Sequence, residues 1–156
     1  MSDLVTNGSF TGNATGWTLQ SGWAYDTNNI SCDGTQSSAS AAFQAIDVVI
    51  GGVYSITFTV SNHSAGYVFA FVGNDFGTGR AANGTFTEQV TYRTGSLIGT
   101  VLADTNFVGT IDNVSAIEIS RPVGQTRRRR VRYYKDEYEY KLGDPFLDDK
   151  DEDDDG

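Results

Sequence analysis

The segment at positions 53–62, in which apolar and polar residues alternate strictly from 54 to 61, is the feature that most constrains the fold. In this segment, VYSITFTVSN, the apolar Tyr54, Ile56 and Phe58 are separated by serine and threonine. Successive side chains of a β-strand point to opposite faces, so the pattern predicts a strand with one face in a core and one in water. A helix would need apolar residues at i, i+3, i+4 and i+7 with helix-favouring residues between them, and residues 1–120 contain no such stretch.

Other apolar or alternating runs predict the remaining strands. Residues 67–72 are apolar on both faces, which is typical of a central strand covered on each side. A glycine-rich loop at 73–79 and a turn at 63–66 separate the runs. In residues 109–120 the apolar parity changes, which predicts a β-bulge near 113–116. The expected strands are residues 4–10, 17–20, 23–26, 41–50, 53–62, 67–72, 85–92, 97–103 and 109–120.

This set of about eight or nine short strands, with a turn signal about every ten residues, predicts the fold class. Residues 1–120 contain fifteen glycines and no proline, whereas Pro122 and Pro145 both follow them. The chain is therefore expected to be all-β, with an antiparallel β-sandwich over residues 1–120. Residues 121–156 are expected to form an extended C-terminal arm.

The charge of the chain reverses along this arm. Residues 1–120 carry nine acidic and two basic side chains, while residues 121–135 carry seven basic and no acidic ones. Residues 136–156 then carry eleven acidic side chains against two lysines. The net charge of −9 argues against a general nucleic-acid-binding protein. Blocks of like charge are typical of interaction tails, so we expect the arm to mediate contacts.

Further features limit the class of protein. The single cysteine, Cys32, excludes an intramolecular disulfide and a cysteine-rich zinc site. No apolar run reaches the length of about 18 residues that a membrane span needs. The N-terminal MSDLVTNGSF lacks the basic start and apolar stretch of a signal peptide. We therefore expect a protein made in a cytoplasm, with no membrane partner.

Three segments of the chain resemble a known family. They are LVTNGSF (residues 4–10) with Gly16-Trp17, GVYSITFTVSN (residues 52–62) and GTIDNVS (residues 109–115). Together they resemble the jelly roll of carbohydrate-binding modules, a galactose-binding-like fold, and more closely the jelly-roll domains of tailed-bacteriophage structural proteins. The resemblance covers residues 4–120 and implies a jelly-roll β-sandwich in which Phe10 and Trp17 are core anchors. It is specific for the fold rather than for a ligand.

The resemblance also implies two kinds of site. Asp112 matches a position where such modules hold a structural calcium, although Thr11 replaces the acidic residue that commonly follows the NGSF phenylalanine. Calcium takes six or more oxygen ligands, so the alternative is that Asp112 bonds backbone groups at a strand start. Stacking on a sugar needs exposed aromatic rings, and Trp23 and Phe76 are the candidate ligand contacts, with core packing as the alternative. No other cofactor is expected.

The sequence does not indicate a catalytic site. His63 is the sole histidine and lies in a Ser-Asn-His-Ser turn, with no spacing that would place it beside Cys32 or a serine as a catalytic base. Glu88 and Glu118 are the only glutamates of the predicted sandwich and would form a glycosidase pair only by coincidence of folding. We therefore expect that the protein is not an enzyme.

The arm is expected to anchor the protein in an assembly. Arms from two copies can pair antiparallel, so that basic residues 127–132 of one meet acidic residues 136–139 of the other. Alternatively, the arginines bind an acidic shell protein, or the phosphate of packaged nucleic acid, which the adjacent acidic block disfavours. A solvated, disordered extension is the remaining alternative. The expected anchor residues are Arg127, Arg128, Arg129, Arg130, Arg132, Tyr133, Tyr134, Tyr138, Tyr140 and Phe146.

The residues and the resemblance together lead to an expected function. It is that of a non-enzymatic virion structural protein of a tailed bacteriophage, assembled in the host cytoplasm. The chain is short and has no repetitive fibre shaft, which favours a capsid decoration or cement protein. Its partners would be the major capsid protein or neighbouring copies. The competing class is a carbohydrate-binding module or tail-associated adhesin that contacts host surface glycans.

Overall fold

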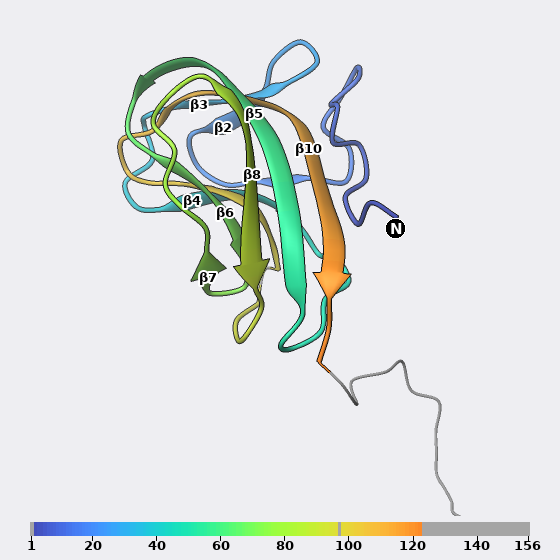
Figure 1. Cartoon of the computed structure of the whole chain (residues 1–156). Helices are drawn as coiled ribbons and strands as arrows, with labels where there is room; N and C mark the ends of the chain where they lie inside the picture. Colours follow the sequence, from blue (N-terminus) through green and yellow to red (C-terminus); the bar gives the residue numbers. More distant parts are fainter. Residues whose placement is uncertain (1, 97, 123–156) are drawn as a thin grey trace, which may run out of the picture. The chain divides into compact units, whose positions relative to one another are not determined.

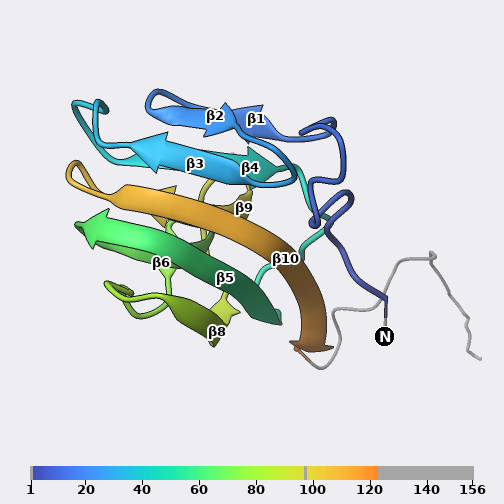
Figure 2. The same cartoon turned by 90° about the horizontal axis from the view of Figure 1, so that it is seen from above.

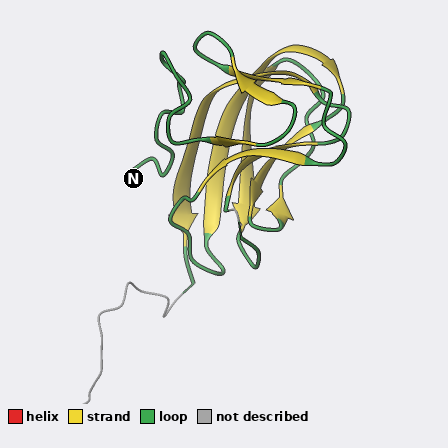
Figure 3. Cartoon of the chain, turned by 180° about the vertical axis from the view of Figure 1, so that it is seen from behind, coloured by secondary structure: helices red, strands yellow, loops and turns green. Residues whose placement is uncertain are grey.

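The structure is a computed structural model that describes residues 2–96 and 98–122 (Figure 1). Ten strands and no helix occur in this part of the chain (Figure 3). The described residues accordingly contain no helix that could span a membrane. The strands are β1 (Thr18–Leu19), β2 (Trp23–Tyr25), β3 (Ile30–Asp33), β4 (Ser40–Gln44), β5 (Val53–Ala65), β6 (Val68–Val72), β7 (Asp75–Phe76), β8 (Gly84–Thr91), β9 (Gly99–Ala103) and β10 (Val108–Ser120).

The strands form two five-stranded antiparallel sheets. Sheet A has the order β1-β4-β9-β6-β7, and sheet B has the order β2-β3-β10-β5-β8. Figure 2 shows β3, β10, β5 and β8 side by side in one layer, with the strands of sheet A behind them. The all-β fold with antiparallel sheets, consistent with a β-sandwich, is therefore confirmed. The arm predicted for residues 121–156 lies, beyond residue 122, outside the described residues.

Strand β5 shows how the alternating pattern becomes burial. Tyr54, Ile56 and Phe58 are fully buried, whereas the serines and threonines between them are partly exposed on the other face. The strand runs on to Ala65, so the turn expected at 63–66 is wrong. The turn comes later, at residues 66–67, where the left-handed Gly66 lets the chain leave sheet B and enter β6 of sheet A. Within β5, the register with β10 shifts between the pairs Val108–Ala65 and Thr110–Ser61.

The bulge predicted in β10 is confirmed. Asp112 pairs with Thr59 and Ser115 with Thr57, so β10 has one more residue than β5 in this interval. Asn113 takes up the extra length with a φ of 51°. The bulge allows both Ile111 and Val114 to face the core, since they are three positions apart and both buried.

The N-terminal segment differs from the prediction of a strand over residues 4–10. It lies against β10, where the Leu4 N–H donates to the Ala116 carbonyl at 2.7 Å and the Val114 N–H donates to the Gly8 carbonyl at 2.9 Å. Asn7 has a φ of 54°, in the left-handed region, which interrupts the extended backbone. The segment is therefore an irregular cover that brings the fully buried Phe10 into the core.

Two strands lie where none was expected. β3 alternates correctly, with Ile30 and Cys32 buried, but serine, cysteine and aspartate carry little strand preference over only four residues. β7 lies inside the loop predicted at residues 73–79 and is only two residues long. Both strands exist because a neighbouring strand pairs with them, which a local pattern does not reveal.

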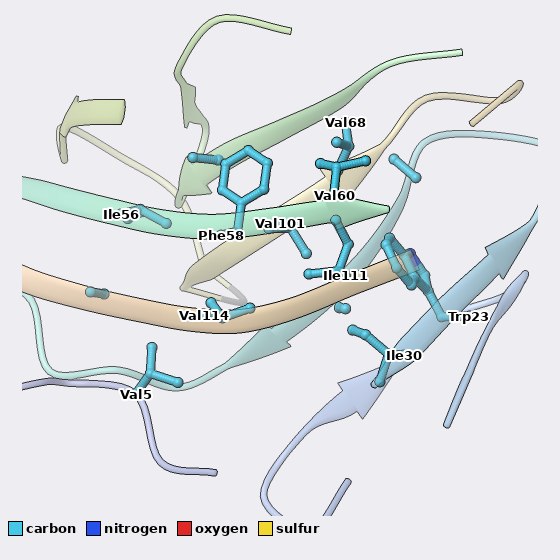
Figure 4. Packing of buried hydrophobic residues seen from close by; sticks show 14 of the residues in the cluster. Val5, Trp23, Ile30, Ile56, Phe58, Val60, Val68, Val101, Ile111 and Val114 are labelled. Carbon is cyan, nitrogen blue, oxygen red and sulfur yellow. The ribbon is translucent and has the colours of Figure 1, made fainter. Parts of the chain in front are cut away.

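The core lies between the two sheets (Figure 4). In this view Trp23, Ile30 and Ile111 lie together, and Phe58 points from β5 toward sheet A. Ala41 and Phe71 are also buried but do not belong to this cluster. The largest fully buried side chains are Tyr54, Phe10, Phe58, Phe107, Ile30, Ile56, Ile111, Val60, Val68, Val72 and Val101.

Candidate functional site

The outer face of sheet A carries the exposed ring singled out in the sequence. Phe76 is 54% exposed and lies on β7, opposite Phe71 of β6. Ala70 and Val72 of β6 belong to the core between the sheets. Because side chains alternate along a strand, Phe69 and Phe71 point to the opposite, outer face. Phe76 thus extends an apolar surface that begins on β6.

Phe69, Phe76 and Leu102 line a shallow hollow on this surface. The two phenylalanine rings lie 6.2 Å apart between centroids and are inclined at 58°, and Leu102 is the register partner of Phe69 on β9. The hollow measures about 90 Å³. Ligand pockets usually measure about 300–1,000 Å³, so this one does not enclose a small molecule. It can seat one apolar side chain or one face of a ring.

Tyr67 completes a surface that we call the aromatic patch and define as Tyr67, Phe69, Phe76 and Leu102. Gly79 lies against two of its rings. Tyr67 is 51% exposed. A Cβ on Gly79 would lie 2.8 Å from the Phe69 ring and 3.1 Å from the Tyr67 ring, so only glycine lets the loop lie flat on both rings. The patch is therefore shaped by the loop that follows β7 as well as by the sheet.

An ion pair lies on the other face of β7. The Arg93 guanidinium lies 3.1 Å from Asp75 Oδ1, and the Arg93 backbone N–H donates to Asp75 Oδ2 at 2.8 Å. Asp75 is the register partner of the core residue Val72, whereas Phe76 is that of Phe71, so the two side chains of β7 point to opposite faces. The ion pair therefore joins β7 to the segment after β8 and does not belong to the aromatic patch.

Trp23 does not contribute to this patch, so its prediction as a ligand contact is wrong. It is only 6% exposed, its ring packs 5.9 Å from that of Phe107, and its Nε1 donates to the Ser40 carbonyl at 3.0 Å. Trp23 lies on the inner face of β2. Because β2 belongs to sheet B, this face packs against sheet A and the ring lies in the core. The ring therefore has no free face for a ligand.

Asp112 has a local partner at the bulge. Its Oδ1 accepts a hydrogen bond from the Asn113 N–H at 2.7 Å, which supports the backbone where the register shifts. The described residues contain no group of three or more histidine, cysteine, aspartate or glutamate side chains that could hold a metal ion. The geometry therefore favours the backbone-bonding interpretation of Asp112.

The other chemically active side chains each have a structural contact. His63 Nε2 lies 2.8 Å from the Gly66 carbonyl oxygen, and its ring packs 6.0 Å from that of Phe107. Cys32 is buried, and burial raises the pKa of its thiol, so the reactive thiolate is disfavoured. Glu88 forms an ion pair with Arg80, and Glu118 forms one with Arg121.

The hydroxyl of Tyr54 also has structural contacts. Its hydroxyl accepts a hydrogen bond from the Val49 N–H at 2.7 Å and lies 3.4 Å from Glu118 Oε2. Burial raises the pKa of Tyr54, and the nearby negative charge of Glu118 adds to this effect. The hydroxyl thus joins the loop before β5 to the end of β10.

The predicted anchor residues, Arg127 to Phe146, lie outside the described residues. The arm therefore stays a prediction, and the aromatic patch is an exposed apolar surface of the described sandwich. Of its members, Phe76 was a predicted ligand contact. Leu102 was not predicted, because its place opposite Phe69 depends on the pairing of β6 with β9. The available signal was the run at residues 67–72, which is apolar on both faces.

Comparisons with known proteins do not extend this description. Neither a scan against protein-family models nor a search of curated proteins found a match to the chain.

Proposed function

We propose that the chain is a non-enzymatic virion structural protein of a tailed bacteriophage, acting as a capsid decoration or cement protein. The proposal takes the sandwich as a displayed jelly roll and residues 121–156 as the anchor to neighbouring subunits. The observation that carries it is the charge pattern of the arm, with seven basic side chains in residues 121–135 and eleven acidic ones in residues 136–156. Such a segment can bind complementary charges on adjacent subunits of a shell.

The described sandwich supports this role in one respect. The aromatic patch is an apolar surface whose hollow suits an inserted side chain better than a small molecule. A contiguous exposed apolar surface commonly marks a protein–protein contact. A displayed domain that also touches its shell would use a surface of this kind.

The proposal is tested with particles produced by the genome that encodes the chain. The full chain, a chain ending at residue 122 and a variant with Arg127–Arg130 replaced by glutamate are each added to particles lacking the protein. We expect only the full chain to co-sediment with the particles. Replacing the same four arginines by lysine is the matched control, since it keeps the charge. Equal incorporation of the truncated chain, or an encoding genome without virion genes, would contradict the proposal.

A second candidate is glycan binding, which the exposed rings of Phe76 and Tyr67 favour. An aromatic ring can stack on the apolar face of a sugar, and both side chains are about half exposed. Glycan-array binding that disappears in Phe76→Ala, with the fold intact by circular dichroism, would support this function. Absence of binding by the full chain across the array would exclude it in favour of the structural role.

A further inference from the structure

The four edges of the two sheets differ sharply in length. In the described residues β1 and β7 are two residues long and β2 is three, whereas β8 is eight residues long. An edge strand presents unpaired N–H and C=O groups that can bind another strand, and a short edge is a common way of limiting such pairing. Figure 2 shows β8 as the outermost strand of its layer, next to β5. Sheet B therefore has one long edge.

The backbone of β8 is regular along its whole length. It pairs with β5 without a register shift from Val53↔Thr91 to Val60↔Gly84, and it ends the strand order of sheet B. Two hydroxyl contacts of 2.9 Å, Thr57 with Thr87 and Thr59 with Thr85, hold its outward side chains against β5. The strand is thus held straight and in register, as a template for pairing must be.

The sequence of β8, GTFTEQVT, lacks the features that usually protect an edge. It contains no proline, no lysine and no bulge. Its outward side chains include Thr85, Thr87 and Gln89, which are exposed and uncharged. No charge on this face of the strand opposes the approach of a second strand.

The one charge of β8 points inward and is neutralised. Glu88 is 8% exposed, and its Oε2 accepts a hydrogen bond from Arg80 Nε at 2.7 Å. The Thr78 N–H donates to Glu88 Oε1 at 3.2 Å, and the Arg80 guanidinium stacks 4.8 Å from the centre of the Phe86 ring. An inward charge can deter edge pairing, but here the same chain supplies the counter-charge.

We propose that β8 is the pairing edge for a second copy of this chain. Two β8 strands would join antiparallel about a two-fold axis, so that the two B sheets become one continuous sheet. Phe86 and Val90 would then face the cores of both copies, and the threonines would lie together on the outer face. This interface adds backbone hydrogen bonds and is independent of the virion role proposed above.

The uncharged outer face of β8 favours a second copy over a charged partner. Residues 1–120 carry nine acidic and two basic side chains, so two copies repel each other over most of their surface. On β8, antiparallel pairing of two identical strands places no like charges opposite each other on the outer face. A basic partner would find no exposed carboxylate on this strand to bind. The self-complementary edge is therefore the place where two copies can meet.

The test is sedimentation of the full chain from micromolar to millimolar concentration. We expect the wild type to form a concentration-dependent dimer, and the double variant Thr87→Lys/Gln89→Lys to raise the dimer Kd at least about tenfold. The matched control is Ser55→Lys/Ser61→Lys, which places the same number of charges on the outer face of the central strand β5 and keeps the two threonine contacts. This control should dimerise like the wild type within about threefold.

Two further measurements make the outcome decisive. Raising the salt reduces the Debye length from about 10 Å at 0.1 M to about 3 Å at 1 M, so pairing through β8 should persist or strengthen while association through the charged arms should weaken. Hydrogen exchange of the wild type should show protection of β8 amides that increases with concentration. A chain that is monomeric throughout, a dimer that survives Thr87→Lys/Gln89→Lys, or a dimer that dissociates in 1 M salt would overturn the proposal.

Discussion

The NGSF, GW and IDNV residues hold the N-terminal segment to the sandwich. Gly8 lies so close to β10 that a Cβ would overlap the Val114 carbonyl oxygen. Trp17 Nε1 donates to the Asn7 carbonyl at 2.9 Å, and its ring packs 4.9 Å from that of Phe10. The NGSF, GW and IDNV segments therefore build one junction. Their spacing in the sequence reflects packing rather than ligand binding.

The close packing at this junction leads us to expect that adding one methyl group at Gly8 destabilises the fold. Gly8→Ala should lower the free energy of unfolding by about 1–3 kcal/mol, since the new methyl must displace the Val114 backbone. The exposed neighbour provides the control, because Ser9→Ala should change stability by less than about 0.5 kcal/mol. Denaturant unfolding of both variants measures the difference, and equal stabilities would contradict the role assigned to Gly8.

At the scale of elements, side chains link the two sheets at the edge formed by β7 and β8. β7 and β8 are the adjacent edges of the two sheets, and Arg80 and Glu88 join them through an ion pair that is largely shielded at the glutamate. Arg80 also pairs its backbone with Val68 of β6 in both directions, at 2.8 and 3.0 Å. The loop after β7 is therefore tied to sheet A by its backbone and to sheet B by its side chain.

Removing this charge should loosen the loop and the edge together. Glu88→Gln should destabilise the domain by about 1–2 kcal/mol, because it leaves the guanidinium without its carboxylate in a partly buried place. The exposed pair offers the comparison, since Asp75→Asn should cost no more than about 0.5 kcal/mol, given that the Arg93 side chain is 68% exposed. The measurement is urea unfolding, and a Glu88→Gln loss as small as that of Asp75→Asn would argue against this linking role.

At the scale of the whole molecule, every described strand ends by Ser120. Among the described residues, the core cluster draws on residues between Val5 and Ala116. We therefore expect residues 123–156 to add little to the stability of the sandwich.

Truncation tests this expectation. A chain ending at residue 122 retains Arg121 and its ion pair with Glu118, so we expect its unfolding midpoint to match that of the full chain within about 1 kcal/mol in free energy. Circular dichroism during thermal unfolding would follow both chains. A truncated chain that fails to fold would show that residues 123–156 belong to the folding unit.

Local patterns in the sequence were enough to predict most of the strands. The alternation of β5, the short spacing of turns and the bulge at Asn113 all follow from which side chains share a face, and neighbouring residues decide that. The same reasoning misplaced residues 4–10, where left-handed φ values at Asn7 and Phe10 break an otherwise strand-like pattern.

What only the tertiary structure decided is which face meets which partner. Periodicity places Trp23 and Tyr25 on one face of β2, but the position of β2 in sheet B turns Trp23 into the core. The sequence pattern likewise shows that residues 67–72 are apolar on both faces. The aromatic patch, however, forms only because β6 pairs with β9 and β7. Alternation is a property of adjacent residues, whereas burial depends on contacts between strands far apart in the chain. The sequence alone therefore determined the class of fold, and the pairing of distant strands determined its surfaces.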